Sequence, residues 1–148
     1  MRNKTLGPPV TRRSFTNTWG ELDYLCQKIH YWLYTRKRKS KAEYYLERLE
    51  RTLGDLPENH SAILREDGLA LLCALKGDVG ESVKHRRREI RLMERLHEEA
   101  RSPRYDDRTR AYMLRGRDSA VLQERRAILE SLKKQRSQQN GDAIRRAK

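Results

Sequence analysis

The chain has little cysteine and no long apolar run. Its 148 residues include two cysteines, Cys26 and Cys73, which form neither a CxxC motif nor any other zinc-binding spacing. We expect two buried thiols in a reducing cytoplasm, with a single disulfide as the open alternative. No apolar stretch approaches 18 residues, and no apolar segment follows the basic residues near the N-terminus. The sequence therefore predicts neither a membrane span nor a secretory signal.

The local patterns of common catalytic sites are also missing. Gly77–Gly80 lacks both the lysine and the preceding strand of a phosphate-binding loop. Cys26 and His30 stand four residues apart and could pair as nucleophile and base, but a core thiol beside a histidine is the more ordinary interpretation. Helix caps and surface charge explain the acidic pairs Glu98-Glu99 and Asp106-Asp107 better than a metal site does. We expect a protein without enzymatic activity, cofactor or metal.

Positive charge is what the chain has in excess. It holds 34 Lys and Arg against 21 Asp and Glu, a net charge of +13, and its pI is near 10.1. The net charge is +8 over residues 1–41, −5 over 42–83 and +10 over 84–148. An excess of this size favours a phosphate-rich partner. The acidic middle could face a protein partner or pair with the basic ends.

Apolar residues recur every three to four positions and predict an all-α fold of about six helices. Thr18 with Glu21, and Asp78 with Glu81, have the spacing of capping boxes, while Gly54, Gly77 and Gly116 are suited to helix ends. We expect three antiparallel hairpins, as a bundle or short stack, in one domain over residues 18–132. The predicted helices span residues 18–35, 40–53, 58–76, 79–100, 107–115 and 118–132. Residues 1–17 are predicted to be a flexible basic arm, and 133–148 a basic tail, helical and frayed at first and then disordered.

A weak internal repeat supports the hairpin arrangement. The turn at Leu75–Asp78 and the following Arg87–Ile90 match Leu114–Asp118 and Arg125–Ile128 at an offset of 38–40 residues. Residues 62–96 resemble a tetratricopeptide-type helical hairpin, with Ser82 at a position where that family favours small residues. Arg86 and Glu89 depart from the family pattern. The resemblance implies stacked helix pairs and a peptide-binding groove.

The first candidate binding segment joins aromatic and cationic side chains. The basic run over residues 36–41 is preceded by Tyr31, Trp32 and Tyr34 and followed by Tyr44 and Tyr45. The aromatic rings could stack on unpaired bases while the basic side chains contact phosphates. The competing interpretation places Trp32 and Tyr45 in the core and the basic run in a solvated loop. The candidate phosphate ligands here are Arg36, Lys37, Arg38, Lys39 and Lys41.

The second candidate cluster lies on the long predicted helix over residues 79–100. Helical spacing brings five basic side chains to one face, where a ladder of guanidinium groups could follow a phosphate backbone. The alternative is that glutamates of the same helix, such as Glu81, Glu94 and Glu98, neutralise the ladder. The candidate ligands are Lys84, Arg87, Arg88, Arg91 and Arg95.

These patterns predict an accessory protein that binds DNA or RNA through phosphate contacts, with weak or no sequence specificity. The alternative is an adaptor whose helical hairpins bind an acidic protein or peptide. Apolar stripes that include Leu92, Met93 and Leu96 could also seal a homo-oligomer.

Overall fold

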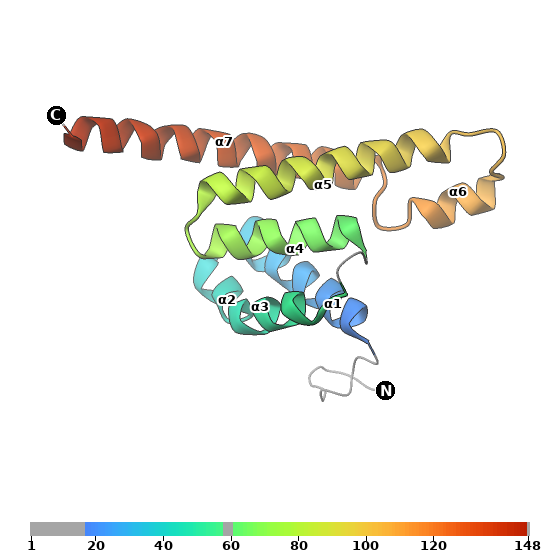
Figure 1. The fold of residues 1–148 in the computed structure, drawn as a ribbon, viewed down its shortest axis with the longest axis horizontal. Helices are drawn as coiled ribbons and strands as arrows, with labels where there is room; N and C mark the ends of the chain where they lie inside the picture. Colours follow the sequence, from blue (N-terminus) through green and yellow to red (C-terminus); the bar gives the residue numbers. More distant parts are fainter. Residues whose placement is uncertain (1–16, 58–60, 148) are drawn as a thin grey trace.

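The structure is a computed structural model that describes residues 17–57 and 61–147, and every regular element in those ranges is helical. The all-α prediction is confirmed (Figure 1). Of the predicted N-terminal arm, only Asn17 lies within the described residues. The elements are α1 (Thr18–His30), the π-helix η3 (Tyr31–Thr35), α2 (Lys39–Glu43), α3 (Leu46–Asp55), α4 (Ala62–Leu75), α5 (Val79–Ala100), α6 (Asp107–Met113) and α7 (Ser119–Ala147).

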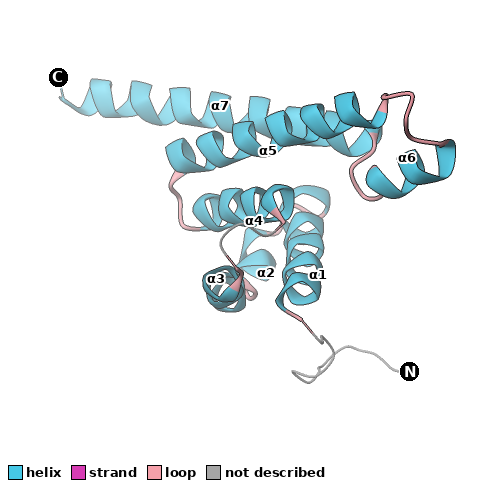
Figure 2. Ribbon diagram, turned by 45° about the vertical axis from the view of Figure 1, so that its right-hand side comes forward, coloured by secondary structure: helices cyan, strands magenta, loops and turns pink. Residues whose placement is uncertain are grey.

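The helices form a stack. Figures 1 and 2 show α7 and α5 side by side at one edge, α4 beneath α5, and α1 to α3 beneath α4. The α4–α5 pair packs antiparallel as a predicted hairpin, and α5 and α7 also pack antiparallel, although α6 lies between them in the sequence. The short α6 lies at the end of the stack where α5 finishes. No helix of the described ranges is long and apolar enough to cross a membrane.

Three apolar clusters hold the stack together. The first joins α1, α3 and α4 and includes Leu22, Ile29, Leu49 and Leu71. The second and third join α5 to α7, through pairs such as Val83 with Ile128 and Met93 with Leu122. The predicted apolar stripes of these helices are therefore their packing faces. At the α4–α5 contact, the Ser82 hydroxyl donates to the Ala70 carbonyl oxygen at 2.7 Å.

Several helix boundaries differ from the predictions. The first helix begins as predicted, but the Asn17 side chain, rather than Thr18, accepts the capping hydrogen bond from the Gly20 amide. Its last predicted turn is the π-helix η3. The helix predicted over residues 40–53 is two helices, with a turn at Tyr44 and Tyr45.

The last helix extends beyond its predicted end. Its apolar contacts finish at Leu132, where the sequence predicts the domain to end, but α7 is helical as far as Ala147. Lys, Arg and Gln are good helix formers, and no proline interrupts this segment. The later part of this segment, which was predicted to be disordered, is thus helical over its described residues.

Two glycine turns correspond to the repeat seen in the sequence. Gly77 ends α4 with a φ of +83°, and Gly116 follows α6 with a φ of +74°. Glycine adopts this left-handed region without a Cβ clash. In both places an aspartate lies shortly after the glycine, and its side chain accepts an amide hydrogen bond at the start of the next helix: Asp78 from Glu81, and Asp118 from Val121.

Candidate functional site

The five basic side chains predicted to share a face of α5 are all exposed. The opposite face of α5 holds Val83, Arg86, Ile90 and Met93, which are buried against the other helices. The predicted ladder is therefore the solvent-facing side of α5, which lies in the outermost layer of the stack (Figure 1). We call this face, made of Lys84, Arg87, Arg88, Arg91 and Arg95, the α5 row.

The glutamates of α5 mostly pair away from this row. Glu89 is buried, Glu94 accepts from Arg126 of α7 at 2.7 Å, and Glu99 accepts from the Tyr105 hydroxyl at 3.0 Å. Glu81 does pair with Lys84, at 2.8 Å.

The other four members of the row have few direct partners. Arg88 lies 4.0 Å from Glu66 of α4. Arg87, Arg91 and Arg95 have no ion pair among the residues that the structure describes. Direct ion pairs with glutamates of the helix, the alternative considered from sequence, are not formed at these three positions, although Glu94, Glu98 and Glu99 line one pocket with Arg91 and Arg95.

The segment Arg36–Lys41 follows the π-helix, and its basic residues are exposed. Trp32 and Tyr45 pack partly buried against the first core cluster, as the alternative interpretation expects. Tyr44, in contrast, is 79% exposed, and Tyr31 is exposed beside Arg36, whose guanidinium lies 3.4 Å from the tyrosine oxygen. Single π turns occur often at functional sites.

The aromatic and cationic side chains of this segment are interleaved as the sequence predicts. The Lys41 ammonium lies 5.7 Å from the centre of the Trp32 ring, and Tyr31 meets Trp32 edge to face. Two rings thus stay accessible next to the five predicted cations. No hydrogen bond or ion pair of the described residues joins this segment to the α5 row, although Tyr34 of η3 packs against the cluster that holds Val79 and Val83 of α5.

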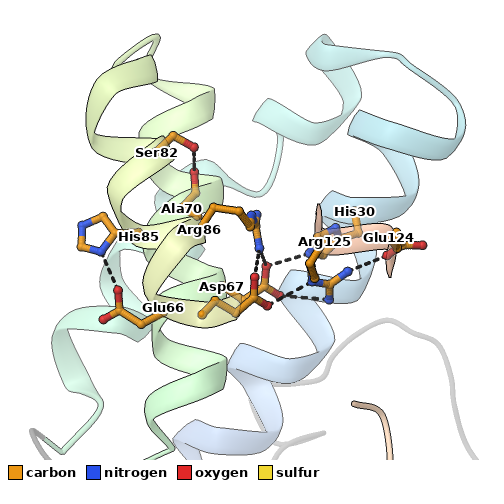
Figure 3. Close-up of polar contacts among 10 residues, drawn as sticks. His30, Glu66, Asp67, Ala70, Ser82, His85, Arg86, Glu124 and Arg125 are labelled. Carbon is orange, nitrogen blue, oxygen red and sulfur yellow. Dashed lines mark hydrogen bonds and ion pairs between the residues drawn. The ribbon is translucent and has the colours of Figure 1, made fainter. Parts of the chain in front are cut away.

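A second feature of α5 is a buried network of charges (Figure 3). The Arg86 side chain is 0% exposed, and its Nη1 donates to Asp67 Oδ1 at 2.5 Å and to Glu89 Oε1 at 2.6 Å. Arg125 donates from Nε to Glu89 Oε2 at 3.0 Å. The His30 Nε2 lies 2.8 Å from Asp67 Oδ1. The network therefore links α1, α4, α5 and α7 through two carboxylates, two guanidinium groups and the His30 imidazole.

Burial disfavours the charged forms of these side chains, whereas the attraction between opposite charges favours them. Burial would raise the pKa of Asp67, but His30, Arg86 and Arg125 outweigh it and hold that pKa well below its usual range. Burial raises the pKa of the Glu89 carboxyl despite the nearby guanidinium groups. The two acids are thus shifted in opposite directions by one set of neighbours.

The network is not fully satisfied within the described residues. The buried Nε of Arg86 and Nδ1 of His30 have no hydrogen-bond partner there. Unpaired buried polar atoms cost free energy, so replacing the whole network by apolar side chains need not destabilise the fold. Removing one member alone is different, because it leaves an opposite charge buried without its partner.

This network was not predicted, although the sequence contains a signal for it. Arg86 and Arg125 both occupy positions in apolar stripes, and Asp67 lies in the most apolar helix of the chain. Arginine or aspartate at a core position indicates a buried partner of opposite charge. Helical spacing identifies the charged residues that occupy core positions, but it does not show which of them come into contact between different helices.

A groove of about 970 Å³ opens beside the network, lined by residues of α1, α4, α5, α6 and α7. Asp67 and Glu89 belong to its lining, and so do three exposed rings, Trp19, Tyr31 and Tyr112. Arg110 positions the α6 wall, because its guanidinium donates to the Ala100 carbonyl at 2.6 Å and to the Ser102 carbonyl at 3.0 Å.

The groove offers no nucleophile of the kind considered from sequence. Cys26 is buried, and burial raises the pKa of its thiol well above the ordinary value, which opposes the reactive thiolate. His30 is engaged by Asp67. Both Cys26 and Cys73 are free thiols.

Within the described ranges, no group of three or more His, Cys, Asp or Glu side chains is placed to hold a metal ion. No protein-family model, curated protein or solved structure matches this chain.

Proposed function

We propose that the protein is a cytoplasmic, non-enzymatic accessory protein that binds nucleic acid through phosphate contacts with little dependence on base sequence. The α5 row supplies one contact surface, and the segment Arg36–Lys41 with Tyr31 and Tyr44 supplies another. Neither surface needs a cofactor or a metal for this role.

The observation that carries the proposal is the unpaired state of Arg87, Arg91 and Arg95. They recur every four residues, so their side chains are neighbours along one face of the helix. Like charges at this spacing repel each other and cost stability, and none of the three forms a direct ion pair among the described residues. A row of unpaired guanidinium groups is suited to bidentate contacts with successive phosphates.

The test is a binding titration with fluorescent single-stranded and duplex DNA and RNA over a salt series. We compare the wild type with a variant carrying Arg87→Gln, Arg91→Gln and Arg95→Gln. Each lost phosphate contact reduces the magnitude of the slope of log affinity against log salt by roughly 0.7–0.9, so losing three contacts reduces it by roughly 2–3. Affinity at low salt falls for every sequence tested.

The matched control carries Arg51→Gln, Arg101→Gln and Arg108→Gln, three exposed arginines outside both surfaces. It has the same net charge as the first variant. If it weakens binding equally, the effect belongs to total charge and the α5 row is not the interface. Absence of binding to all four nucleic acids at low salt overturns the proposal.

The groove favours a second candidate function, an adaptor for a protein or peptide. Its lining combines exposed rings with apolar residues such as Ile63, Met93 and Val121, and apolar grooves of this type accept amphipathic segments. Complexes formed there would tolerate salt, because burial of apolar surface drives them. Binding of a protein partner that survives 0.5 M salt, roughly, and is lost on Trp19→Ala and Tyr112→Ala supports this candidate.

A further inference from the structure

The C-terminal half of α7 stands apart from the rest of the fold. Figures 1 and 2 show α7 projecting past the start of α5, with no other helix alongside it. Leu132 is its last buried residue, and no residue of 133–147 is buried. We call residues 133–147 the α7 extension.

The extension is basic and has no apolar stripe. It carries one acidic residue, Asp142, which pairs with Arg145. Its single large aliphatic residue, Ile144, is 61% exposed. A helix that packs on a protein surface or another helix needs an apolar face, and this one has none. The basic residues of the extension are Lys133, Lys134, Arg136, Arg145 and Arg146.

The amide side chains of the extension are gathered on one side. Gln135, Gln138 and Gln139 have i, i+3 and i+4 spacing and therefore share a face. With about 100° between successive residues, Lys134 falls on one flank of this face and Arg136 on the other. The extension thus presents amides between Lys134 and Arg136, and the same face also holds Asp142, which pairs with Arg145, and Arg146.

We propose that the α7 extension inserts into the major groove of duplex DNA, with the glutamine face toward the base edges. This inference rests on the proposed function and assigns its partner as B-form DNA. Glutamine can make two hydrogen bonds to an adenine edge in that groove. The flanking Lys134 and Arg136 contact the phosphates of the two strands that form its walls.

The dimensions agree with this occupant. An α-helix with its side chains is about 10–12 Å across, and the major groove of B-form DNA is about 12 Å wide. The extension is roughly 22 Å long at about 1.5 Å per residue. The major groove of A-form RNA is too deep and narrow for a helix, so duplex RNA binds more weakly.

We assign the α5 row to the backbone of the same duplex. The α5 row and α7 belong to one layer of the stack, joined by the Arg126–Glu94 ion pair at 2.7 Å. The row contacts backbone phosphates beside the site where the extension enters the groove. These contacts position the protein, and the glutamine face adds a preference for adenine-containing sequences.

The experiment uses the full chain with a 20-base-pair DNA and an RNA duplex of the same sequence. One variant carries Gln135→Ala, Gln138→Ala and Gln139→Ala. Its control carries Ser137→Ala and Asn140→Ala, two polar residues on the other side of the extension. Alanine favours helix, so both variants keep the extension helical. Methylation of purine bases by dimethyl sulfate reports groove contact, because guanine N7 lies in the major groove and adenine N3 in the minor groove.

We expect the wild type to prefer DNA over RNA duplex by at least about tenfold and to protect guanine N7. The glutamine variant loses about tenfold in affinity for the DNA together with the protection, and the control variant loses neither. If the glutamine variant binds the DNA with wild-type affinity, or if the wild type protects adenine N3 instead of guanine N7, this inference is overturned. Either result leaves the proposed function intact. Failure of the wild type to bind any nucleic acid overturns both.

Discussion

Arg86 and Arg87 are neighbours in the sequence, but they lie in opposite environments. The Arg86 side chain is 0% exposed and bonds two carboxylates, whereas Arg87 faces solvent without an ion pair among the described residues. The same contrast recurs on α7, where the Arg125 side chain is 13% exposed and that of Arg126 is 41% exposed. Adjacent helical positions point about 100° apart, so one arginine of each pair joins helices while the other meets solvent or pairs at the surface.

The contrast separates stability from binding. A buried guanidinium contributes by satisfying buried acids, and its removal leaves those acids unpaired. An exposed guanidinium contributes little to the fold, and its charge stays available to a partner. Substitutions in the two classes should therefore change different measurements.

The largest effect is expected from Arg86→Met. Methionine fits a core position but leaves Asp67 and Glu89 short of a positive partner, and breaking such a pair costs about 3–5 kcal/mol. We expect the free energy of unfolding, measured by urea titration, to fall by that amount. Arg87→Met is the control and should change it by no more than about 0.5 kcal/mol. Equal losses in both variants would remove the distinction between the two arginines.

A smaller loss is expected from Arg125→Met. Arg125 keeps partial contact with solvent, and after its removal both acids still have Arg86. We expect a loss of about 2–3 kcal/mol, near the lower end of the range for a broken buried pair. Arg126→Met removes only the surface pair with Glu94 and should cost at most about 1 kcal/mol. A loss for Arg126→Met as large as that for Arg125→Met contradicts the ranking by burial.

The pH dependence of stability tests the network through Asp67. Its pKa is depressed in the folded protein, so its contribution is present above the unfolded value of about 3.9 and is lost as the pH falls. Below pH ~4 we expect Asp67→Asn to remove a slope of up to about 1.4 kcal/mol per pH unit. Because the pKa of Glu89 is raised in the folded protein, its titration changes the free energy of unfolding at higher pH and does not mask the slope that Asp67 produces.

Unfolding of the wild type, Asp67→Asn and Asp55→Asn between about pH 2 and 6 measures this slope. Asp55 is an exposed carboxylate at the end of α3, so Asp55→Asn should follow the wild type. The prediction is wrong if Asp67→Asn retains the wild-type slope.

The smallest expected effect has the opposite sign. Replacing Arg87, Arg91 and Arg95 with Gln relieves two like-charge contacts at i, i+4 spacing, each worth about 0.2–0.5 kcal/mol. We expect the variant to be more stable at low salt by up to about 1 kcal/mol, although it binds nucleic acid less well. The gain should disappear near 0.5 M salt, roughly, because the repulsion is then screened. A loss of stability at low salt would indicate a structural role for the row.

Much of the fold follows from local sequence signals. The apolar stripes located the packing faces of α5 and α7, and Gly77 and Gly116 marked turns that adopt positive φ. Local signals also placed the α5 row on one face. The split at Tyr44 and Tyr45 was missed, because the apolar pattern continues through it while the backbone does not.

The buried network could not be assembled from sequence. Asp67 and Arg125 are 58 positions apart, and only tertiary packing brings the Arg125 Nη2 to 3.6 Å from Asp67 Oδ2. The pairing of Glu94 with Arg126 has the same origin. Helical spacing limits which residues share one face, but it gives no register between faces of different helices.

The linkage of four helices by the network has a consequence for the order of folding during synthesis. When the ribosome has released residues 18–100, Asp67, Arg86 and Glu89 have already emerged, but Arg125 has not. The nascent chain then holds two interior acids with one arginine to bind them, alongside His30. Arrival of Arg125 supplies the second guanidinium, and α7 covers Val79 and Val83 in the same step. The charges of the interior thus come into balance only when the last helix docks.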